Sequence, residues 1–574
     1  MSTSAPARPK GLQSDFEEEI DSLLQEFLTT PAKSQKDDFE PDPLQDRLFR
    51  ALVESYTSSS MSLCFGGCGC LCEDHHGSNE ESSYYPYLNR FLADPPKSLT
   101  NLDMAFEDPR YFLSFPDAIG GTGTNLTTVS ITNDMENETS NGGHDSLGRL
   151  LYCTRFIQKV DLYEFHPSHG DCEFFSSEWD VPRMFESRTE SLYIQGSQIC
   201  CEDAVILHEK TTFPRLKVLD ICAIQLGPGV NPLEFWKQIL SKAANSLKEL
   251  HYHEDIEDSD SPSARLFPTL CIALSRQGSM PVGLERMDLR GVCPNTLFHL
   301  ELVARSSIGW TLKNLAIYGY LLEPCLAPTI AAFRCLESLR VDLEHYNHPL
   351  QYRLGETRLT NFLVDYSKSS LGTQNLKKLI IYYADLITSI FRTTCWPTVE
   401  ELVLVQTGLG HGKNTTGDDD SSALFPFKKV FPALKTLNLL KEESISSKVV
   451  EHIICSAPLL QLLKVRGVVV PSPEKAQSYS LLKKMVKAKQ NLFDLDLTFK
   501  QSDGSKGLDH QQKFEKHVRL YTFLHRIDES LKDSTPSVPV GLYPHILEKC
   551  EGRTGTTGLY LALKDKLLLG IGFS

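Results

Sequence analysis

The chain has 574 residues, a formal net charge of -16 at pH 7, 41% hydrophobic residues and 23% charged residues. Because this length is several times that of one globular core, the sequence predicts either several domains or one extended repeat array. The negative charge disfavours a nucleic-acid duplex or an anionic membrane as partner, and no apolar run approaches the roughly 20 residues that cross a bilayer.

Cysteine usage indicates a reducing environment. Most of the 16 cysteines stand singly within apolar segments, as Cys222 and Cys271 do. This placement is typical of buried, reduced thiols, and the N-terminus lacks the pattern of a signal peptide. We therefore expect a cytoplasmic or nuclear protein with free thiols.

Residues 1–97 are expected to be mostly disordered, with a linker rich in Pro, Lys and Asp at 31–45. The exception is 15–29, where Ile20, Leu24 and other apolar residues share one face of a helix and acidic residues fall near its positive end. This amphipathic helix is expected to pack on the rest of the chain or, alternatively, to dock into a groove of a partner.

The densest cluster of potential metal ligands follows in the same region. Tetrahedral zinc needs four converging ligands, usually from two separate knuckles. Here all candidates lie within 13 positions, so the sequence favours thiols in a loop and leaves metal binding as an alternative. The weak candidates are Cys64, Cys68, Cys70, Cys72, His75 and His76.

Internal repetition dominates residues 98–500. The pattern L-x-x-L-x-L, with other apolar residues allowed, has clear copies at Leu216-Leu219-Ile221 and at Leu434-Leu437-Leu439. We count about 14 copies whose starts are on average about 30 residues apart, close to the range of leucine-rich repeats. The last two apolar residues of each copy point to one face of a short strand, so stacked units would bury one another's apolar sides beside a parallel sheet.

Helices are predicted where a unit is long enough to hold one. Asn231 followed by Pro232 is typical of an N-cap and a first-turn proline. Trp236 and Ile239 then begin a run with helical spacing, and residues 448–455 show the same pattern. Each long unit is therefore expected to contain a strand, a loop and a helix.

These repeats resemble the leucine-rich-repeat superfamily. They are most similar to its irregular intracellular subclass of F-box and ribonuclease-inhibitor-like proteins, in which phrases such as Phe431-Pro432-x-Leu434-Lys435 are common. The resemblance implies an α/β solenoid that is curved, with a parallel sheet on the concave face and helices or irregular segments outside. One departure is that Ile224, Val292 and Thr407, for example, stand where the family usually carries Asn or Cys.

The concave face of the predicted sheet is the candidate binding surface. Side chains that flank the last strand leucine point away from the core, and they include Tyr and Arg, which are favoured at protein interfaces. The candidate residues are Tyr163, Asp220, His251, His253, Arg290, Tyr318, Arg340, Asp342, Tyr382 and Arg466.

The sequence contains no recognisable catalytic set. Residues 408–413 follow a predicted strand and are rich in Gly, but Thr407 and Asn414 stand where a P-loop needs Gly and Ser or Thr. Motifs of metalloproteases, serine hydrolases and kinases are missing. We therefore expect no enzymatic activity and no cofactor.

Residues 501–574 are predicted to form a helical C-terminal cap. Phe514, Val518 and Tyr521 share a helix face. Residues 539–569 are similar to C-terminal segments of repeat proteins in microalgae such as diatoms. A cap would cover the strand edge and the apolar surface that the end of a solenoid exposes.

Taken together, these patterns predict a non-catalytic scaffold that binds a protein partner, and neither nucleic acid nor membrane, through the concave face. The F-box resemblance implies a first alternative, a substrate-recognition subunit of a ubiquitin ligase. Asp42-Pro43-Leu44 is a faint echo of the opening of an F-box, and no adaptor-binding residue is carried over. A metal-binding protein that uses the cluster from Cys64 to His76 is the second alternative, and the sequence does not indicate the oligomeric state.

Overall fold

The computed structural model divides into two compact units, residues 1–311 and 312–574. The structure describes part of each unit. The described residues are 10–29, 43–65, 86–106, 125–133, 147–163, 184–199, 204–227, 229–254, 266–278, 280–290, 292, 294–318, 322, 324–343, 349–382, 391, 393–406, 427–440, 445–469 and 494–499.

A parallel sheet in unbroken register organises the first unit. Each strand pairs with the next in chain order, apart from short strands that lie outside this ladder. The first residues of the strands are register partners in turn, from Ser60 opposite Asn101 to Glu249 opposite Arg286. The strands are β1 (Ser60–Phe65), β2 (Asn101–Phe106), β3 (Thr128–Asn133), β4 (Lys159–Tyr163), β6 (Ser191–Gln195), β9 (Val218–Cys222), β11 (Glu249–His253) and β12 (Arg286–Arg290).

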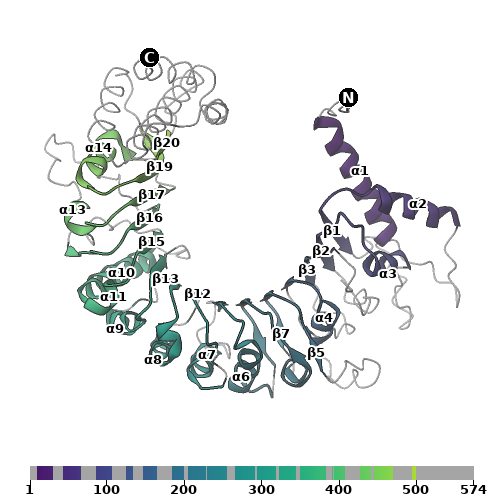
Figure 1. The fold of residues 1–574 in the computed structure, drawn as a ribbon, viewed down its shortest axis with the longest axis horizontal. Helices are drawn as coiled ribbons and strands as arrows, with labels where there is room; N and C mark the ends of the chain where they lie inside the picture. The colour runs from purple at the N-terminus through teal and green to yellow at the C-terminus, as the bar shows by residue number, and fades with distance from the viewer. Residues whose placement is uncertain are drawn as a thin grey trace, which may run out of the picture. The chain divides into compact units, whose positions relative to one another are not determined.

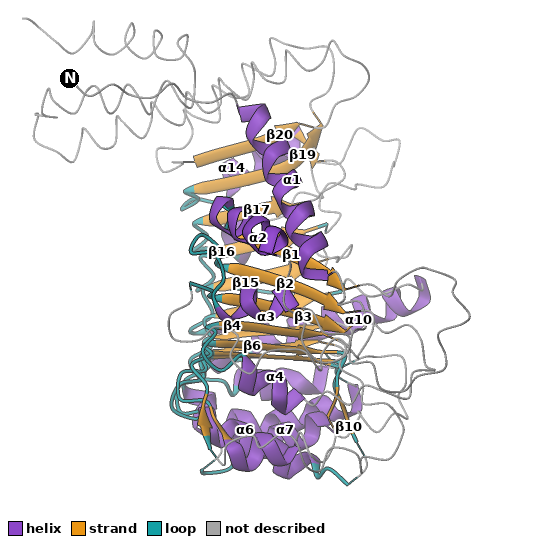
Figure 2. Cartoon of the chain, turned by 90° about the vertical axis from the view of Figure 1, so that its right-hand side faces the viewer, coloured by secondary structure: helices purple, strands orange, loops and turns teal. Residues whose placement is uncertain are grey.

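Helices connect many of these strands on the outer side of the ladder (Figures 1 and 2). They are α4 (Leu147–Cys153), α6 (Pro232–Ala243), α7 (Leu266–Ser275) and α8 (Leu300–Arg305). Apolar side chains from the strands and helices, such as Leu219, Leu250 and Trp236, are fully buried between the two layers. The predicted α/β solenoid of strand, loop and helix is therefore confirmed.

The local sequence signals account for where these elements begin. Asn231 caps α6, because its side-chain oxygen accepts hydrogen bonds from the backbone N–H groups of Leu233 and Glu234 at 3.0 and 3.2 Å. Phe213, which precedes a proline, is buried beneath the turn that leads into β9. Ile224 is buried as well, so an apolar side chain fills a position where the family usually carries a polar one.

The described residues before 98 add a strand and three helices to the first unit. β1 pairs with β2, so the ladder begins one strand earlier than the repeat pattern predicts. Polar residues surround Met61 and Leu63, which explains why the pattern does not reveal β1. α1 (Lys10–Thr29) contacts β1, α2 (Pro43–Ser55) and α3 (Pro86–Ala93), and the rings of Phe27, Phe49 and Tyr87 pack together among the three helices.

The second unit repeats the same scheme. Its strands are β13 (Asn314–Tyr318), β14 (Ser338–Asp342), β15 (Lys378–Tyr382), β16 (Glu401–Val405), β17 (Thr436–Leu440), β18 (Ile445–Ser446), β19 (Leu462–Val469) and β20 (Asp494–Phe499). All pair in parallel, with β18 and β20 both bonded to β19. Its helices are α9 (Ala327–Ala331), α10 (Pro349–Lys368), α11 (Ser370–Thr373), α13 (Phe427–Val430) and α14 (Ser447–Ser456).

The last two residues of every predicted triplet in both units lie on a strand, and the helix expected at 448–455 is α14. Trp396 and Phe431, which both precede proline, are fully buried like Phe213 in the first unit. The predicted C-terminal cap at 501–574 lies outside the described residues, so this prediction stays open.

Candidate functional site

The parallel register of the first unit lines side chains up in rows on the inner face of its sheet. In each strand the second and fourth residues enter the core, and the third and fifth point to the opposite side. The third row is Ser62, Asp103, Ser130, Asp161, Tyr193, Asp220, His251 and Asp288. The described side chains of the fifth row are Ala105, Thr132, Tyr163, Gln195, Cys222, His253 and Arg290.

Aspartates occupy alternate strands along the third row. Asp103, Asp161, Asp220 and Asp288 lie on β2, β4, β9 and β12, and a serine, a tyrosine or a histidine separates each pair. Since neighbouring strands are about 4.8 Å apart, successive carboxylates are separated by about 10 Å, which limits their mutual repulsion. The row therefore presents acidic groups at a regular spacing.

Two of these four carboxylates have a lysine or arginine beside them on the same face. Asp161 lies 2.7 Å from the Nζ of Lys159. Asp288 is only 3% exposed and accepts hydrogen bonds from Nε and Nη2 of Arg290 at 3.2 and 3.3 Å. A carboxylate that is nearly covered is stabilised by such a two-point contact, so the pairing holds Arg290 in place on the face.

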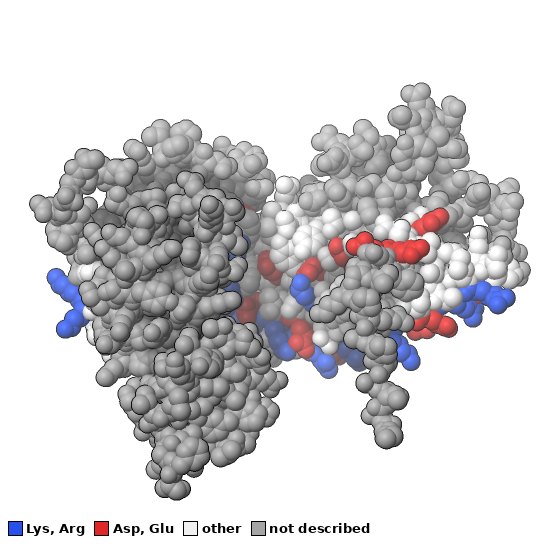
Figure 3. Space-filling model, turned by 90° about the horizontal axis from the view of Figure 1, so that it is seen from above, with Lys and Arg blue, Asp and Glu red and all other residues white. Residues whose placement is uncertain are grey.

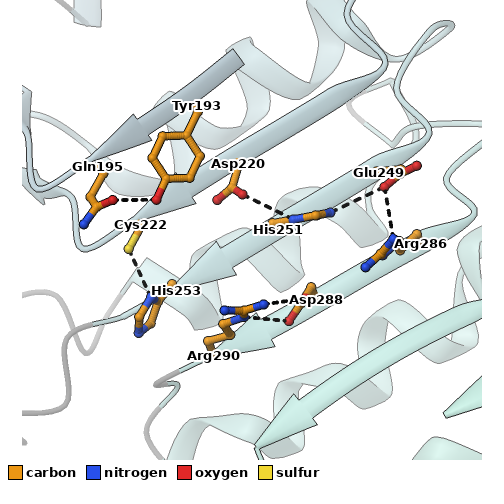
Figure 4. Close-up of polar contacts among 10 residues, drawn as sticks. All are labelled: Tyr193, Gln195, Asp220, Cys222, Glu249, His251, His253, Arg286, Asp288 and Arg290. Atoms are coloured by element: carbon orange, nitrogen blue, oxygen red, sulfur yellow. Dashed lines mark hydrogen bonds and ion pairs between the residues drawn. The ribbon is translucent and has the colours of Figure 1, made fainter. Parts of the chain in front are cut away.

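His251 is the centre of the polar network in Figure 4. Its Nδ1 lies 3.2 Å from Oδ2 of Asp220, and its Nε2 lies 3.5 Å from Oε2 of Glu249, which in turn lies 3.7 Å from Arg286. Burial of the ring lowers its pKa, but the hydrogen bond and charge of Asp220, with the charge of Asp288, outweigh burial and raise the pKa above the ordinary 6.5.

Cys222 and His253 form a second pair on adjacent strands (Figure 4). The Sγ of Cys222 lies 3.0 Å from Nδ1 of His253, and Cys222 is 7% exposed. Ala223 follows with a φ of 50° and donates its N–H to the carbonyl of His253 at 2.7 Å, which fixes the two strand ends together. The pair supplies two potential metal ligands, and the described residues contain no group of three.

An aromatic pair lies beside this network. The rings of Tyr163 and Tyr193 are 5.2 Å apart, and the hydroxyl of Tyr193 donates to Oε1 of Gln195 at 2.5 Å. Burial raises the pKa of both tyrosines, and the nearby charge of Asp220 raises it further. Both hydroxyls therefore remain protonated donors at neutral pH.

The second unit has a smaller polar cluster on its strand face. Nη2 of Arg340 lies 3.0 Å from Oδ2 of Asp342, and the guanidinium carbon lies 4.5 Å from the ring centre of Tyr382. Asp342, predicted as a partner-binding residue, is 4% exposed in this cluster, and its role in partner binding stays a prediction. Tyr318 and Arg466 lie on β13 and β19, and their side chains are outside the description.

Sequence reasoning selected single residues and missed the pairs that they form. The partners Glu249, Arg286 and Cys222 were not candidates, although all three stand in strands that the repeat identifies. It also missed apolar residues on the strand face of the second unit, Ile380, Val403 and Leu440. The consecutive apolar residues of β15 and β16 could have indicated Ile380 and Val403, and the pair Leu439-Leu440 could have indicated Leu440.

The other candidate sites are not tested by the structure. Of the metal cluster, only the backbone of Cys64 in β1 is described, and the remaining ligands lie outside the described residues. Pro43 and Leu44 of the faint F-box motif begin helix α2, which contacts α1. The ubiquitin-ligase hypothesis stays a prediction. No described helix combines the length and apolar character that a membrane span requires.

The strand, loop and helix units stacked in register define an α/β solenoid of the leucine-rich-repeat type. Neither a scan of protein-family models nor a search of curated proteins gives a match. Several solved structures are similar to this chain, among them the following two of low identity. The TLR13–ssRNA13 complex has a TM-score of 0.35 and 13% identity over 72% of this chain and 54% of that chain. The LRR protein LIC12759 of Leptospira interrogans has a TM-score of 0.25 and 12% identity over 74% and 92%.

This chain therefore spans about half the length of the TLR13 chain that it matches. The assignment of the architecture rests on the strand register described above and not on these two similarities.

Proposed function

We propose that the chain is a non-catalytic scaffold that binds a protein partner through the strand faces of its units. The observation that carries the proposal is the largely polar face of the first unit, where the third row runs across eight strands and the described part of the fifth row across seven, in one register. Solenoids use such extended faces for recognition. Arg340 and Tyr382 supply a corresponding, smaller patch on the second unit.

The chemistry of the first face suits a folded protein surface. Tyr163 and Tyr193 offer apolar area with a hydroxyl group, the features that favour hot spots at protein interfaces. Asp103, the exposed carboxylate of the third row, would pair with a lysine or arginine of the partner. Because His251 and Arg290 are already held by neighbouring carboxylates, little side-chain entropy would be lost on binding.

Nucleic acid is disfavoured as the partner of the first unit's face. Binding to a phosphate backbone needs many cations in a row, whereas the third row of the first unit carries carboxylates on alternate strands. In the view of Figure 3, both acidic and basic side chains are visible on the described surface, and no continuous basic band crosses it.

Affinity capture with paired variants tests the proposal. The full-length chain would be compared with Tyr163→Ala/His251→Ala, which removes two inner-face groups, and with Lys237→Ala on helix α6 as an outer-face control. Loss of one large interface side chain costs about 2 kcal/mol or more at a hot spot, which is about 30-fold in affinity. We expect proteins retained by the wild type and by the control to be lost from the inner-face variant, and equal retention by all three chains would refute the proposal.

A further inference from the structure

Two tyrosines on adjacent strands of the first unit form an aromatic pair on the inner face. Tyr163 ends β4 and Tyr193 lies in the middle of β6, and their ring centres are 5.2 Å apart with an angle of 47° between the ring planes. Both side chains are half-buried, so part of each remains open to solvent. The hydroxyl of Tyr193 is fixed by its 2.5 Å hydrogen bond to Gln195 (Figure 4), so little order would have to be gained on binding.

Carboxylates surround the aromatic pair. Asp161 and Asp220 are the register partners of Tyr193 on the strands to either side, and Asp103 lies on β2, two strands from β4. Burial and then the negative charges of these three aspartates raise the pKa of Tyr163, so the field of all three reaches its ring. Because the face of an aromatic ring is itself negative, the ring and the carboxylates together favour a cation.

Asp103 is the carboxylate of this group that is open to a partner. The other two aspartates lie 2.7 and 3.2 Å from a side-chain nitrogen of a lysine and of a histidine. In the described part of the chain no lysine or arginine pairs with the exposed Asp103, whose carboxylate accepts a 3.4 Å hydrogen bond from Ser62. The inner-face residues of β3 that separate it from the tyrosines are the short Ser130 and Thr132. Since β2 and β4 are about 10 Å apart, a long side chain lying over β3 would reach Asp103 and the ring of Tyr163 together.

The second unit contains the same chemical groups with a cation in place. Asp342 and Tyr382 are register partners on adjacent strands. The guanidinium carbon of Arg340 lies 4.5 Å from the ring centre of Tyr382, and its Nη2 donates to a carboxylate oxygen of Asp342 at 3.0 Å. A guanidinium makes both contacts at once because its face covers the ring while its N–H donors lie in the plane. In the first unit no lysine or arginine of the described residues lies over either tyrosine of the pair.

We infer that the surface formed by Tyr163, Tyr193 and Asp103 binds an arginine side chain of a protein segment. The inference rests on the proposed function, because this surface is part of the inner face of the first unit, and it names the chemistry of the partner. Arginine is favoured over lysine, because an ammonium is a compact and strongly hydrated charge that cannot cover a ring and pair with a carboxylate in the same way.

The test uses the full-length chain and a fluorescein-labelled nonapeptide in which three arginines are separated by single glycines and flanked by alanine and glycine. Fluorescence anisotropy at low ionic strength should show saturable binding of this peptide. The same peptide with lysine in place of arginine should bind at least about fivefold more weakly. A citrulline version, which keeps the shape of arginine without its charge, should show no saturable binding.

Variants of the chain separate the ring from the carboxylate. Tyr163→Leu should weaken binding of the arginine peptide by about fivefold, and Tyr163→Phe, which keeps the ring, should stay within about twofold of the wild type. Asp103→Asn should weaken binding by about fivefold. Glu301→Gln on helix α8 removes an equal charge away from the sheet, and it should change binding by less than about twofold. Asp103 is exposed, so circular dichroism melts of Asp103→Asn should match the wild type.

Several results would overturn the inference. They are equal binding of the arginine and lysine peptides, equal effects of Glu301→Gln and Asp103→Asn, a loss in Tyr163→Phe as large as in Tyr163→Leu, and the absence of saturable binding. If affinity capture still lost proteins in the Tyr163→Ala/His251→Ala variant, the scaffold proposal would stand without this inference. The two failures are therefore distinguishable.

Discussion

Replacement of Leu250 by alanine tests the inward and outward assignment of strand residues on which the candidate face depends. Leu250 is fully buried in β11 and is in register with Leu219 on β9 and Met287 on β12. The change removes about three methylene equivalents at about 0.8 kcal/mol each. It also leaves a cavity between two neighbouring strands, so we expect the free energy of unfolding to fall by about 3 to 5 kcal/mol.

Hydrogen exchange measured by mass spectrometry, together with urea unfolding, would locate and quantify this loss. Because each repeat of a solenoid contacts mainly its neighbouring repeats, protection of the backbone amides from exchange should fall most in β9, β11 and β12 and least in β2. The control is His251→Ala, the next residue in the same strand, which faces the other side and contacts Asp220. Its cost should be about 1 kcal/mol or less, as for other ion pairs near a surface.

The relative loss of stability in Leu250→Ala and His251→Ala tests which strand residues face the core. If His251→Ala destabilised β11 as much as Leu250→Ala, the assignment of faces in this unit would be refuted. Uniform loss of protection across the first unit would instead refute the nearest-neighbour account of its stability.

Three further predictions concern single interactions of the first unit. Asn231→Ala should lower stability by about 1 kcal/mol in urea unfolding, and Asn231→Ser should restore most of it, because the cap of α6 is a side-chain oxygen. Tyr252→Phe removes the buried hydroxyl that donates to Glu254 at 2.5 Å and should lower the free energy of unfolding by about 1 to 3 kcal/mol. In a chain that already carries Glu254→Gln, the same change of Tyr252 should cost less. The raised pKa of His251 means that its contribution to stability is fully present below pH 6.5 and is lost as pH rises through the folded-state pKa. Thermal melts across this interval should show the loss, and Asp220→Asn should remove it; an unchanged pH profile in that variant would contradict the assignment.

The solenoid itself could be predicted from the sequence, because its cause is local. Alternation of apolar residues such as Leu219 and Ile221 directs both side chains to one face whatever the neighbouring strand is. The cap of α6 at Asn231 is equally local, since the donors lie two and three residues further along the chain. Strand positions, outward-facing candidates and the buried aromatics before proline all follow from signals of this kind.

Only the tertiary structure decided which outward-facing residues meet. Asp220 lies beside His251, and Cys222 beside His253, because two successive repeats of the first unit stack with their strands in the same register. The repeats differ in length, so the sequence spacing between these residues does not reveal the contacts. The gathering of Asp103, Tyr163 and Tyr193 on one part of the inner face has the same origin. Alternation along a strand is fixed by the geometry of each residue, whereas contact across strands depends on how the whole core packs.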